Sequence, residues 1–461
     1  MRKLLLIGVL AGACVVGGAT PASGASPLRP DPATKTPIKH FITLMQENHT
    51  YDNYFGTYPR GDGLQPGTCM PVKPSQAKGP CVRPFHIGDN KVVVRDLDHS
   101  GQTFLRQLNG GRMNGFVNAL NLRNQDGRLA MGYYDDRDLP YYWNLADEYV
   151  LYDRFFSSAA AGSFLNHLYW VAGSAGGGAD RIPANGLGSD VPTIFDRLQE
   201  RGVSWKFYVQ NYDPQLNYRT VNSYPGNRAS QVIWVPILNF PRFLDRPDLF
   251  SHIVPLEHYY RDLERGTLPA VSFIAPSGPS EHPPSSIKSG QAFVRTLINT
   301  LVRSKHWKSS AFMIQYDDWG GWYDHVKPPK VDKYGYGFRV PALLISPFAR
   351  RGHVDSTVLD YTSILKFIEE NWGLAHLAER DRKASSFASG FDFSKGPRVA
   401  RFTSFERGTV QTEPNNSWMF IYTFYGGVLL LAEFAICWAV FSRGRGGRDP
   451  AVALGEGGGA T

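Results

Sequence analysis

Short apolar runs rich in β-branched residues alternate along this chain with longer, helix-like segments, and this alternation limits the folds that the chain can adopt. The strand-like runs are "FITLM" (41–45), "VSWKFYV" (203–209), "PAVSFIAP" (269–276), "AFMIQYD" (311–317) and "VPALLISPF" (340–348). The helix-like segments occupy 139–156, 191–202, 290–304 and 362–373. Strands that alternate with helices predict an α/β fold, in which helices flank a central, mostly parallel sheet.

Polar side chains follow three of these strand-like runs at the point where each run ends. The three groups are Glu47, Asn48 and His49 after 41–45, "SGPSEHPP" after the apolar part of 269–276, and Asp317 and Asp318 after 311–316. Ligands of such sheets bind beyond the carboxyl ends of the strands. We therefore expect these groups to meet at one edge of the sheet, where they form either a hydrogen-bonded loop or a site.

The acidic groups suit a divalent cation. Asp317 and Asp318 repel each other, so burying both in a cleft requires a cation or a shared proton. Glu47 and the amide oxygen of Asn48 add further hard oxygen donors. The glycines of "WGGWYDHV" that follow allow a tight turn. The alternative for Asp317 and Asp318 is a solvated turn without a ligand.

A serine and three histidines complete the set of reactive side chains. Ser163 in "AAAGSFLNHLYW" is either a helix cap or a nucleophile, because a helix N-terminus favours an approaching phosphate. His99, His282 and His325 each have an acidic residue close by in the sequence, which can fix their tautomers. They could bind metal, hold anionic oxygens or protonate a leaving alkoxide. These parts together indicate phosphoryl transfer. A Ser/His/Asp peptidase would leave the clustered oxygen donors unexplained.

The two ends of the chain predict export and a membrane anchor. Residues 1–25 have two cations, an apolar stretch and then small residues, as in a secretory signal peptide; a lipoprotein modified at Cys14 is the alternative. Residues 418–441 contain one acid, Glu433, and are long enough for a span, which needs about 20 residues. Arginines follow, which predicts a cytoplasmic tail at 442–461. The alternative is a buried helix of the globular domain.

The cysteines fit an exported chain. Cys69 and Cys81 flank a loop that contains proline and lysine, and an oxidising compartment favours a disulfide between them. Two free thiols are the alternative. The formal net charge of +8 is scattered along the sequence, so it does not single out nucleic acid as a partner.

Six segments, in order, resemble the bacterial phospholipase C and acid phosphatase family of phosphoesterases, which are relatives of the alkaline phosphatase superfamily. They are "MQENHTYDNYFGTYP", "DLDHS…NGGRMNGFV", "MGYYDDRDLPYYWNLADEYVLYDRFFSSAAAGSFLNHLYWVAGSA", "VSFIAPSGPSEHPPSSIKSGQAFV", "YDDWGGWYDHVKPP" and "GFRVPALLISPFARRGHVDSTVLDYTSILKFIEENWGL". They cover residues 36–374. The resemblance implies an alkaline-phosphatase-like fold. Together with the predictions for the two ends of the chain, it gives a catalytic domain at 26–405, a linker at 406–417 and the transmembrane helix at 418–441.

The resemblance also implies roles for individual residues. Glu47 and Asn48 match the first metal-binding pair of the family, and Asp317 and Asp318 match the second. Ser163 matches the hydroxyl nucleophile, and His99 and His282 match histidines around the bound phosphate. His325 follows the Asp-Asp segment as in relatives.

The sequence departs from the family pattern in two places. The family often has Gly-Pro-Thr-x-Pro-Asn around the nucleophile, whereas "AGSFLN" keeps Asn166 but lacks both prolines, which indicates a change in loop stiffness. Ser356 and Tyr361 stand where relatives often have histidines, so activity or substrate choice could differ.

The expected activity is that of an exported, membrane-anchored, metal-assisted phospholipase C acting on phosphatidylcholine-type lipids. The bound ion would be Ca, Mg or Zn. An acid phosphatase that acts on phosphate monoesters is one alternative. A non-catalytic surface binding protein on the same scaffold is another.

Overall fold

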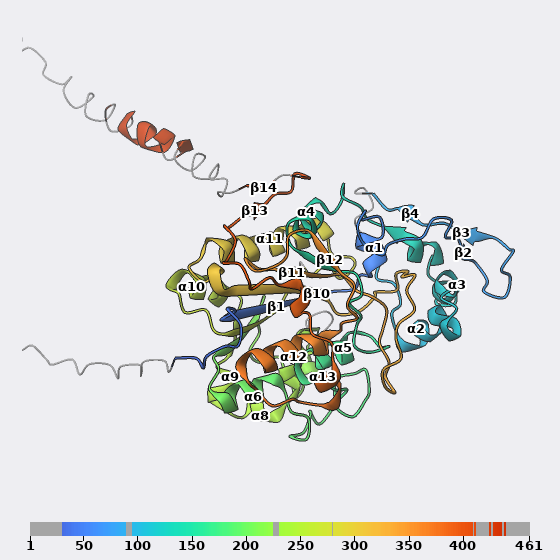
Figure 1. Cartoon of the computed structure of the whole chain (residues 1–461), viewed down its shortest axis with the longest axis horizontal. Helices are drawn as coiled ribbons and strands as arrows, with labels where there is room; N and C mark the ends of the chain where they lie inside the picture. The colour runs from blue at the N-terminus through green and yellow to red at the C-terminus, as the bar shows by residue number, and fades with distance from the viewer. Residues whose placement is uncertain are drawn as a thin grey trace, which may run out of the picture.

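The computed structural model describes residues 30–88, 95–224, 230–278, 280–408, 410–411, 424–425, 427–435 and 438. Its centre is an eight-stranded sheet with the order β12-β6-β11-β10-β1-β9-β7-β8 (Figure 1). These strands are β1 His40–Gln46, β6 Val150–Tyr152, β7 Trp205–Val209, β8 Ile253–Pro255, β9 Val271–Ala275, β10 Ser310–Tyr316, β11 Ala342–Ile345 and β12 His353–Asp355. Two-residue strands pair outside this sheet: β2 Met70–Pro71 with β3 Cys81–Val82, β4 Phe85–His86 with β5 Gly132–Tyr133, and β13 Phe402–Thr403 with β14 Val410–Gln411.

The central strands run parallel and end together. β1 pairs with β10 from His40↔Ser310 to Gln46↔Tyr316 and pairs with β9 on its other side. β11 runs antiparallel to both β10 and β6. All seven residues of β10 and six of the seven of β1 are buried, which explains why both read as continuous apolar runs. Since β1, β9 and β10 share a direction, the residues that follow them emerge at one edge of the sheet.

Helices cover both faces of the sheet, as predicted for this fold class. Figure 1 shows α4, α10 and α11 on one side and α5, α6, α12 and α13 on the other. The helices are α1 Tyr51–Phe55, α2 Gly101–Leu108, α3 Phe116–Asn121, α4 Pro140–Glu148, α5 Ser163–Ala172, α6 Ile194–Arg201, α7 Gln231–Trp234, α8 Pro241–Leu244, α9 Pro247–Phe250, α10 Glu257–Arg265, α11 Ile287–Arg303, α12 Tyr361–Trp372 and α13 Glu379–Lys383. The predicted α/β architecture is confirmed.

One predicted helix is wrong in its second half. The segment 139–156 was expected to be helical throughout, but α4 ends at Glu148 and Val150–Tyr152 form β6. β6 lies between β11 and β12 in the sheet and is completely buried. Pairing on both sides, together with the β-branched and aromatic residues, outweighs the helical pattern that precedes this strand.

The structure also bears on the cysteines and on the ends of the chain. Cys69 and Cys81 form a disulfide, which confirms the predicted pairing. The predicted signal peptide (1–25) and tail (442–461) lie outside the described residues, as does half of the predicted span at 418–441. None of the helices in the described part of the chain is both long and apolar enough to cross a membrane.

Candidate active site

The four predicted metal ligands meet where β1 and β10 end. The backbone N–H groups of Asn48 and Asp318 both donate to Oδ1 of Asp317, over 2.9 Å and 2.7 Å. Asn48 has a left-handed backbone with φ of 61°, which asparagine tolerates better than most residues. Glu47, Asn48, Asp317 and Asp318 are all completely buried. The solvated turn considered for Asp317 and Asp318 is therefore excluded.

A histidine that the sequence analysis did not select joins this group. His167, on α5, places Nε2 3.1 Å from Oε1 of Glu47 and 3.7 Å from Oδ2 of Asp317. Burial lowers the pKa of His167 to about 4, so its imidazole is neutral, as a metal ligand must be. A signal was present in the sequence, because His167 follows Ser163 by four residues and so lies on the same face of a helix.

Several buried oxygens at this edge have no hydrogen-bond partner among the described residues. They are Oε2 of Glu47, Oδ1 of Asn48 and Oδ2 of Asp317. Burial, followed by the charges of Asp317 and Asp318, raises the pKa of Glu47 well above its ordinary value. Burial and then Asp317 do the same to the pKa of Asp318. Buried oxygens that lack hydrogen-bond partners and lie among several acidic side chains fit a divalent cation. Ligand atoms of Glu47, His167 and Asp317 all lie within 4.8 Å of one another.

Ser163 is the first residue of α5 and faces the acidic group. Its Oγ donates to Oδ2 of Asp318 over 3.3 Å. Gly162, not Ser163, is the N-cap residue, so the helix-cap alternative does not account for this hydroxyl. No hydrogen bond of the described residues engages the N–H of Ser163 or Phe164, because the first N–H groups of a helix have no partner within it. These two N–H groups are available to an anion.

The side chain of Asn166 explains why this part of the family pattern is kept. Its amide nitrogen donates to the carbonyl oxygens of Ala161 and Gly162, over 2.9 Å and 3.1 Å. Its oxygen accepts from the N–H of Ala159 over 2.9 Å. Asn166 thereby holds the turn that leads into Ser163.

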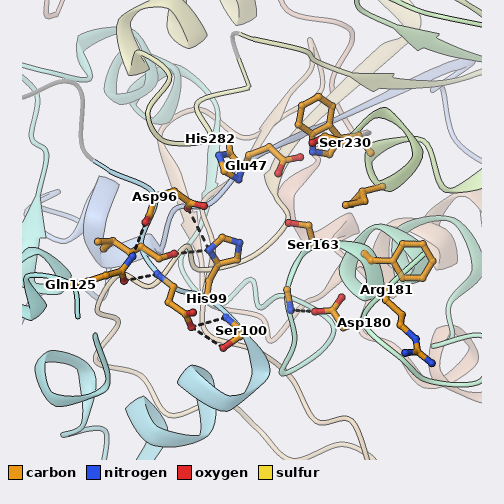
Figure 2. Close-up of a pocket in the computed structure, with 16 residues that line it drawn as sticks. Glu47, Asp96, His99, Ser100, Gln125, Ser163, Asp180, Arg181, Ser230 and His282 are labelled. Atoms are coloured by element: carbon orange, nitrogen blue, oxygen red, sulfur yellow. Dashed lines mark hydrogen bonds and ion pairs between the residues drawn. The ribbon is translucent and has the colours of Figure 1, made fainter. Parts of the chain in front are cut away.

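His99 and His282 lie on the other side of the serine. Together with Glu47, Ser163 and Asp96 they line a pocket of about 520 Å³, and Figure 2 shows these labelled side chains around one shared space. The ring centroids of the two histidines are 6.1 Å apart. In each ring Nδ1 lies 2.7 Å from a backbone carbonyl, that of Leu97 for His99 and that of Pro283 for His282. Nδ1–H donation to these carbonyls orients both rings.

The charge of His99 follows from its neighbours. Burial lowers the pKa of His99, but the carboxylates of Asp318 and Asp96 outweigh burial and raise the pKa to about 9. The raised pKa favours the protonated imidazole, which is the form that donates to an anionic oxygen.

A buried glutamate fixes the segment that carries His282. The carboxylate of Glu281 accepts hydrogen bonds from the hydroxyls of Tyr54 and Tyr316, both over 2.6 Å, and from that of Tyr142. Glu281 has a left-handed backbone with φ of 69°. The adjacent His282 is thus attached to the core through the side chain of its neighbour.

The structure does not bring His325 into this pocket. Its Nδ1 lies 2.7 Å from Oδ2 of Asp52, and its Nε2 lies 3.2 Å from Oδ1 of Asp62. The buried Arg339 pairs with Asp52 and Asp324 in the same cluster. The acids near His325 therefore belong to a separate ion-pair network that they share with Arg339. The prediction from an adjacent acid in the sequence is wrong here, because that acid pairs with the arginine and not with a group in the pocket.

The two positions where relatives often have histidines differ from each other in this structure. Tyr361 is completely buried, and its hydroxyl lies 2.5 Å from the backbone carbonyl of Asp317 and also donates to that of Tyr316. It therefore supports the metal-site turn from behind. Ser356 is exposed after β12.

Comparison with known proteins gives a consistent result. The model of the Phosphoesterase family matches residues 38–375. Phospholipase C B of Mycobacterium tuberculosis is 30% identical and aligns over 82% of each chain. The non-hemolytic phospholipase C of Burkholderia pseudomallei is 28% identical over 72% of this chain, which spans 55% of that longer protein. A solved structure of an alkaline phosphatase superfamily protein from Vibrio parahaemolyticus is 12% identical, covers 84% of this chain and 86% of its own, and has a TM-score of 0.37. The family match and the curated relatives confirm the predicted class, a hydrolase that acts on phosphoric ester bonds, and the chain belongs to the Phosphoesterase family.

Proposed function

We propose that this protein is a phospholipase C that hydrolyses the phosphodiester of phosphatidylcholine-type lipids, with Ser163 as its nucleophile. The observation that carries the proposal is the position of the Ser163 hydroxyl. It lies 3.3 Å from Asp318 and opens on the pocket that Glu47, His99 and His282 also line. The curated relatives named phospholipase C support the choice of a phosphodiester.

The residues around the pocket have different roles in the proposed reaction. Asp318 accepts the hydrogen bond of Ser163 and orients the hydroxyl toward phosphorus. The N–H groups of Ser163 and Phe164 and the cationic His99 donate to the phosphoryl oxygens, where negative charge collects. As the bond between Ser163 Oγ and phosphorus forms, the serine proton passes to Asp318, and the bond from phosphorus to the glyceryl oxygen breaks. His282 gives that oxygen a proton. Water then attacks phosphorus and gives a proton back to His282, the bond from phosphorus to Ser163 Oγ breaks, and Asp318 returns the proton to the serine, which releases the phosphorylated head group.

Glu47, Asn48, Asp317, Asp318 and His167 would hold the divalent ion. Once bound, the ion would lower the pKa of the serine hydroxyl and offset the charge of the phosphate. Four oxygen-bearing side chains suit Ca or Mg, while an imidazole in the group favours Zn.

The test is a substrate panel on the full-length protein in detergent micelles. We expect diacylglycerol and phosphocholine from phosphatidylcholine, and loss of nearly all turnover in Ser163→Ala. Ser251→Ala, at an exposed position, is the matched control and should keep the wild-type rate. Release of inorganic phosphate from monoesters, with phosphatidylcholine left intact, would establish an acid phosphatase instead. Tight lipid binding without turnover under any divalent ion would establish a binding protein.

We also propose that the protein is exported and anchored by residues 418–441, with the catalytic domain outside the cytoplasm. Among the described residues of this segment, Leu429, Leu431 and Phe434 are 66%, 71% and 67% exposed, which supports a role outside the globular core. The Cys69–Cys81 disulfide supports an oxidising compartment. Alkaline extraction of membranes tests the anchor: retention in the pellet is expected, and release into the supernatant would refute it.

A further inference from the structure

An acid from outside α5 binds the backbone on both sides of Ser163. Asp180 lies in the loop between α5 and α6. Its Oδ2 accepts from the N–H of Gly162 over 2.6 Å, and its Oδ1 accepts from the N–H of Leu165 over 3.1 Å. Figure 2 shows Asp180 beneath Ser163 at the rim of the pocket. One carboxylate thus bridges the residue before the nucleophile and the residue two positions after it.

This arrangement restrains the direction of the serine side chain. Hydrogen bonds from backbone N–H groups to a carboxylate are charge-assisted, and an anion at a helix N-terminus is further stabilised by the helix dipole. With both oxygens engaged, the backbone from Gly162 to Leu165 cannot rotate without losing a hydrogen bond. The Ser163 hydroxyl keeps its position beside Asp318 only while that backbone is fixed.

The two residues whose N–H groups donate to Asp180 lie where this chain departs from the family pattern. Gly162 and Leu165 are the places where the resembled pattern, Gly-Pro-Thr-x-Pro-Asn, has its two prolines. Proline has no N–H and holds φ near −65° by its ring. This chain has neither ring, and its two additional N–H groups share one acceptor.

We propose that Asp180 is the positioning residue of the nucleophile, and that it restrains the Ser163 turn by hydrogen bonds in place of proline rings. The inference rests on the proposed function, because Ser163 must be the attacking group for its position to matter. Asp180 itself touches neither phosphorus nor the leaving group in this assignment.

A proline ring and the hydrogen bond to Asp180 cannot coexist at position 162, because proline has no N–H to donate. Gly162 has φ of −79°, which a proline can adopt. A Cβ atom built on Gly162 would lie 2.9 Å from Oδ2 of Asp180, closer than real Cβ contacts allow. A proline there should therefore be harmful while Asp180 is present and helpful once Asp180 is replaced by alanine.

The first experiment compares steady-state kinetics and melting temperature for full-length variants on phosphatidylcholine micelles. Asp180→Ala should lower kcat about tenfold, the size expected for lost capping bonds, and change KM less than twofold. Asp180→Asn keeps a single acceptor oxygen, so its kcat should lie between those of the wild type and Asp180→Ala. Asp190→Ala, an exposed acid of the same loop, is the control and should leave kcat unchanged. An unchanged kcat in Asp180→Ala would overturn the proposal.

Rescue separates positioning from general stability. Adding Gly162→Pro and Leu165→Pro to Asp180→Ala should restore most of the lost kcat, whereas Gly162→Pro alone should lower kcat. If the triple variant folds with the melting temperature of Asp180→Ala but regains no rate, the proposal is wrong. If the triple variant does not fold, two other results decide whether the proposal holds. They are the graded loss of kcat from the wild type through Asp180→Asn to Asp180→Ala, and the exchange measurement below.

Amide hydrogen exchange needs no substrate and tests the Asp180 clamp, by which we mean the two hydrogen bonds from the N–H groups of Gly162 and Leu165 to Asp180. The peptide that contains 162–165 should exchange slowly in the wild type and faster in Asp180→Ala, with no change in Asp190→Ala. Equal exchange in wild type and Asp180→Ala would overturn the clamp even in an active enzyme. A wild type that hydrolyses no phosphate ester but shows the expected exchange pattern would refute the proposed function and leave the clamp established.

Discussion

The backbone N–H of Asn48 donates to Oδ1 of Asp317 over 2.9 Å, although the two residues are 269 positions apart in the sequence. One carboxylate therefore has two tasks. Oδ1 aligns the turns after β1 and β10, while Oδ2 is left without a partner among the described residues and faces Glu47 and His167. Alignment of the turns and binding of an ion are thus distinct properties of the same side chain, and a single substitution can separate them.

Asp317→Asn should remove the ion but keep the fold. The amide oxygen of asparagine can still accept the N–H of Asn48, whereas the negative charge is lost. We expect the melting temperature of the metal-free protein to stay within a few degrees of that of the metal-free wild type, and metal affinity to fall about a hundredfold or more. Titration of the metal-free protein with Zn, Mg and Ca by calorimetry measures this. Asp248→Asn, at an exposed helix start, should bind like the wild type; metal binding that survives in Asp317→Asn would place the ion elsewhere.

His167→Ala should weaken metal binding although no sequence pattern selected this residue. Nε2 of His167 is 3.1 Å from Glu47, so its loss removes either a ligand or the group that orients one. We expect affinity to fall about tenfold to a hundredfold. His258→Ala, on α10 across the sheet, provides the comparison. Equal affinities in the two variants would show that His167 only fills space.

Metal removal should destabilise the folded protein as well as inactivate it. An ion that binds the folded chain at a hundred times its Kd adds about 2.7 kcal/mol to the free energy of unfolding. Exhaustive dialysis against a chelator should therefore lower the melting temperature by several degrees, and the matching ion should restore both melting temperature and activity. In Asp317→Asn the chelator should cause no shift; a full shift in that variant would contradict the assigned site.

Stability should depend on pH through Glu281. Burial raises the pKa of Glu281 from its ordinary value of 4.5 to about 7. Below pH 4.5 both folded and unfolded chains hold this proton. As pH rises toward 7 the unfolded chain loses the proton while the folded chain keeps it, so the free energy of unfolding falls, by about 3 kcal/mol in total.

Glu281→Gln isolates this contribution, because glutamine does not titrate. Urea unfolding at pH values from 4.5 to 8 should show the free energy of unfolding of the wild type falling relative to that of the variant up to about pH 7, and running parallel to it above. A constant difference between the two proteins across the whole range would show that Glu281 keeps its ordinary pKa.

Much of the site was predictable because it depends on where strands end. Glu47 and Asp317 follow apolar runs that pair in register, and parallel pairing brings their carboxyl ends together. The strand Val150–Tyr152 was missed because its pairing with β11 and β12 outweighs a local helical pattern. The role of Asp180 could not be predicted either, since hydrogen bonds from backbone N–H groups to a loop side chain leave no mark in spacing or composition.

The central position of β1 has a consequence for synthesis. β1 spans His40–Gln46, but its two neighbours in the sheet are made of residues 271–275 and 310–316. While the ribosome is still translating the intervening chain, this largely buried strand has no partner on either side. A product that terminates before residue 310 keeps an open apolar edge, which promotes aggregation. Translation must pass Asp318 before the proposed ion site is complete, so chains that end before this residue lack two of its proposed ligands.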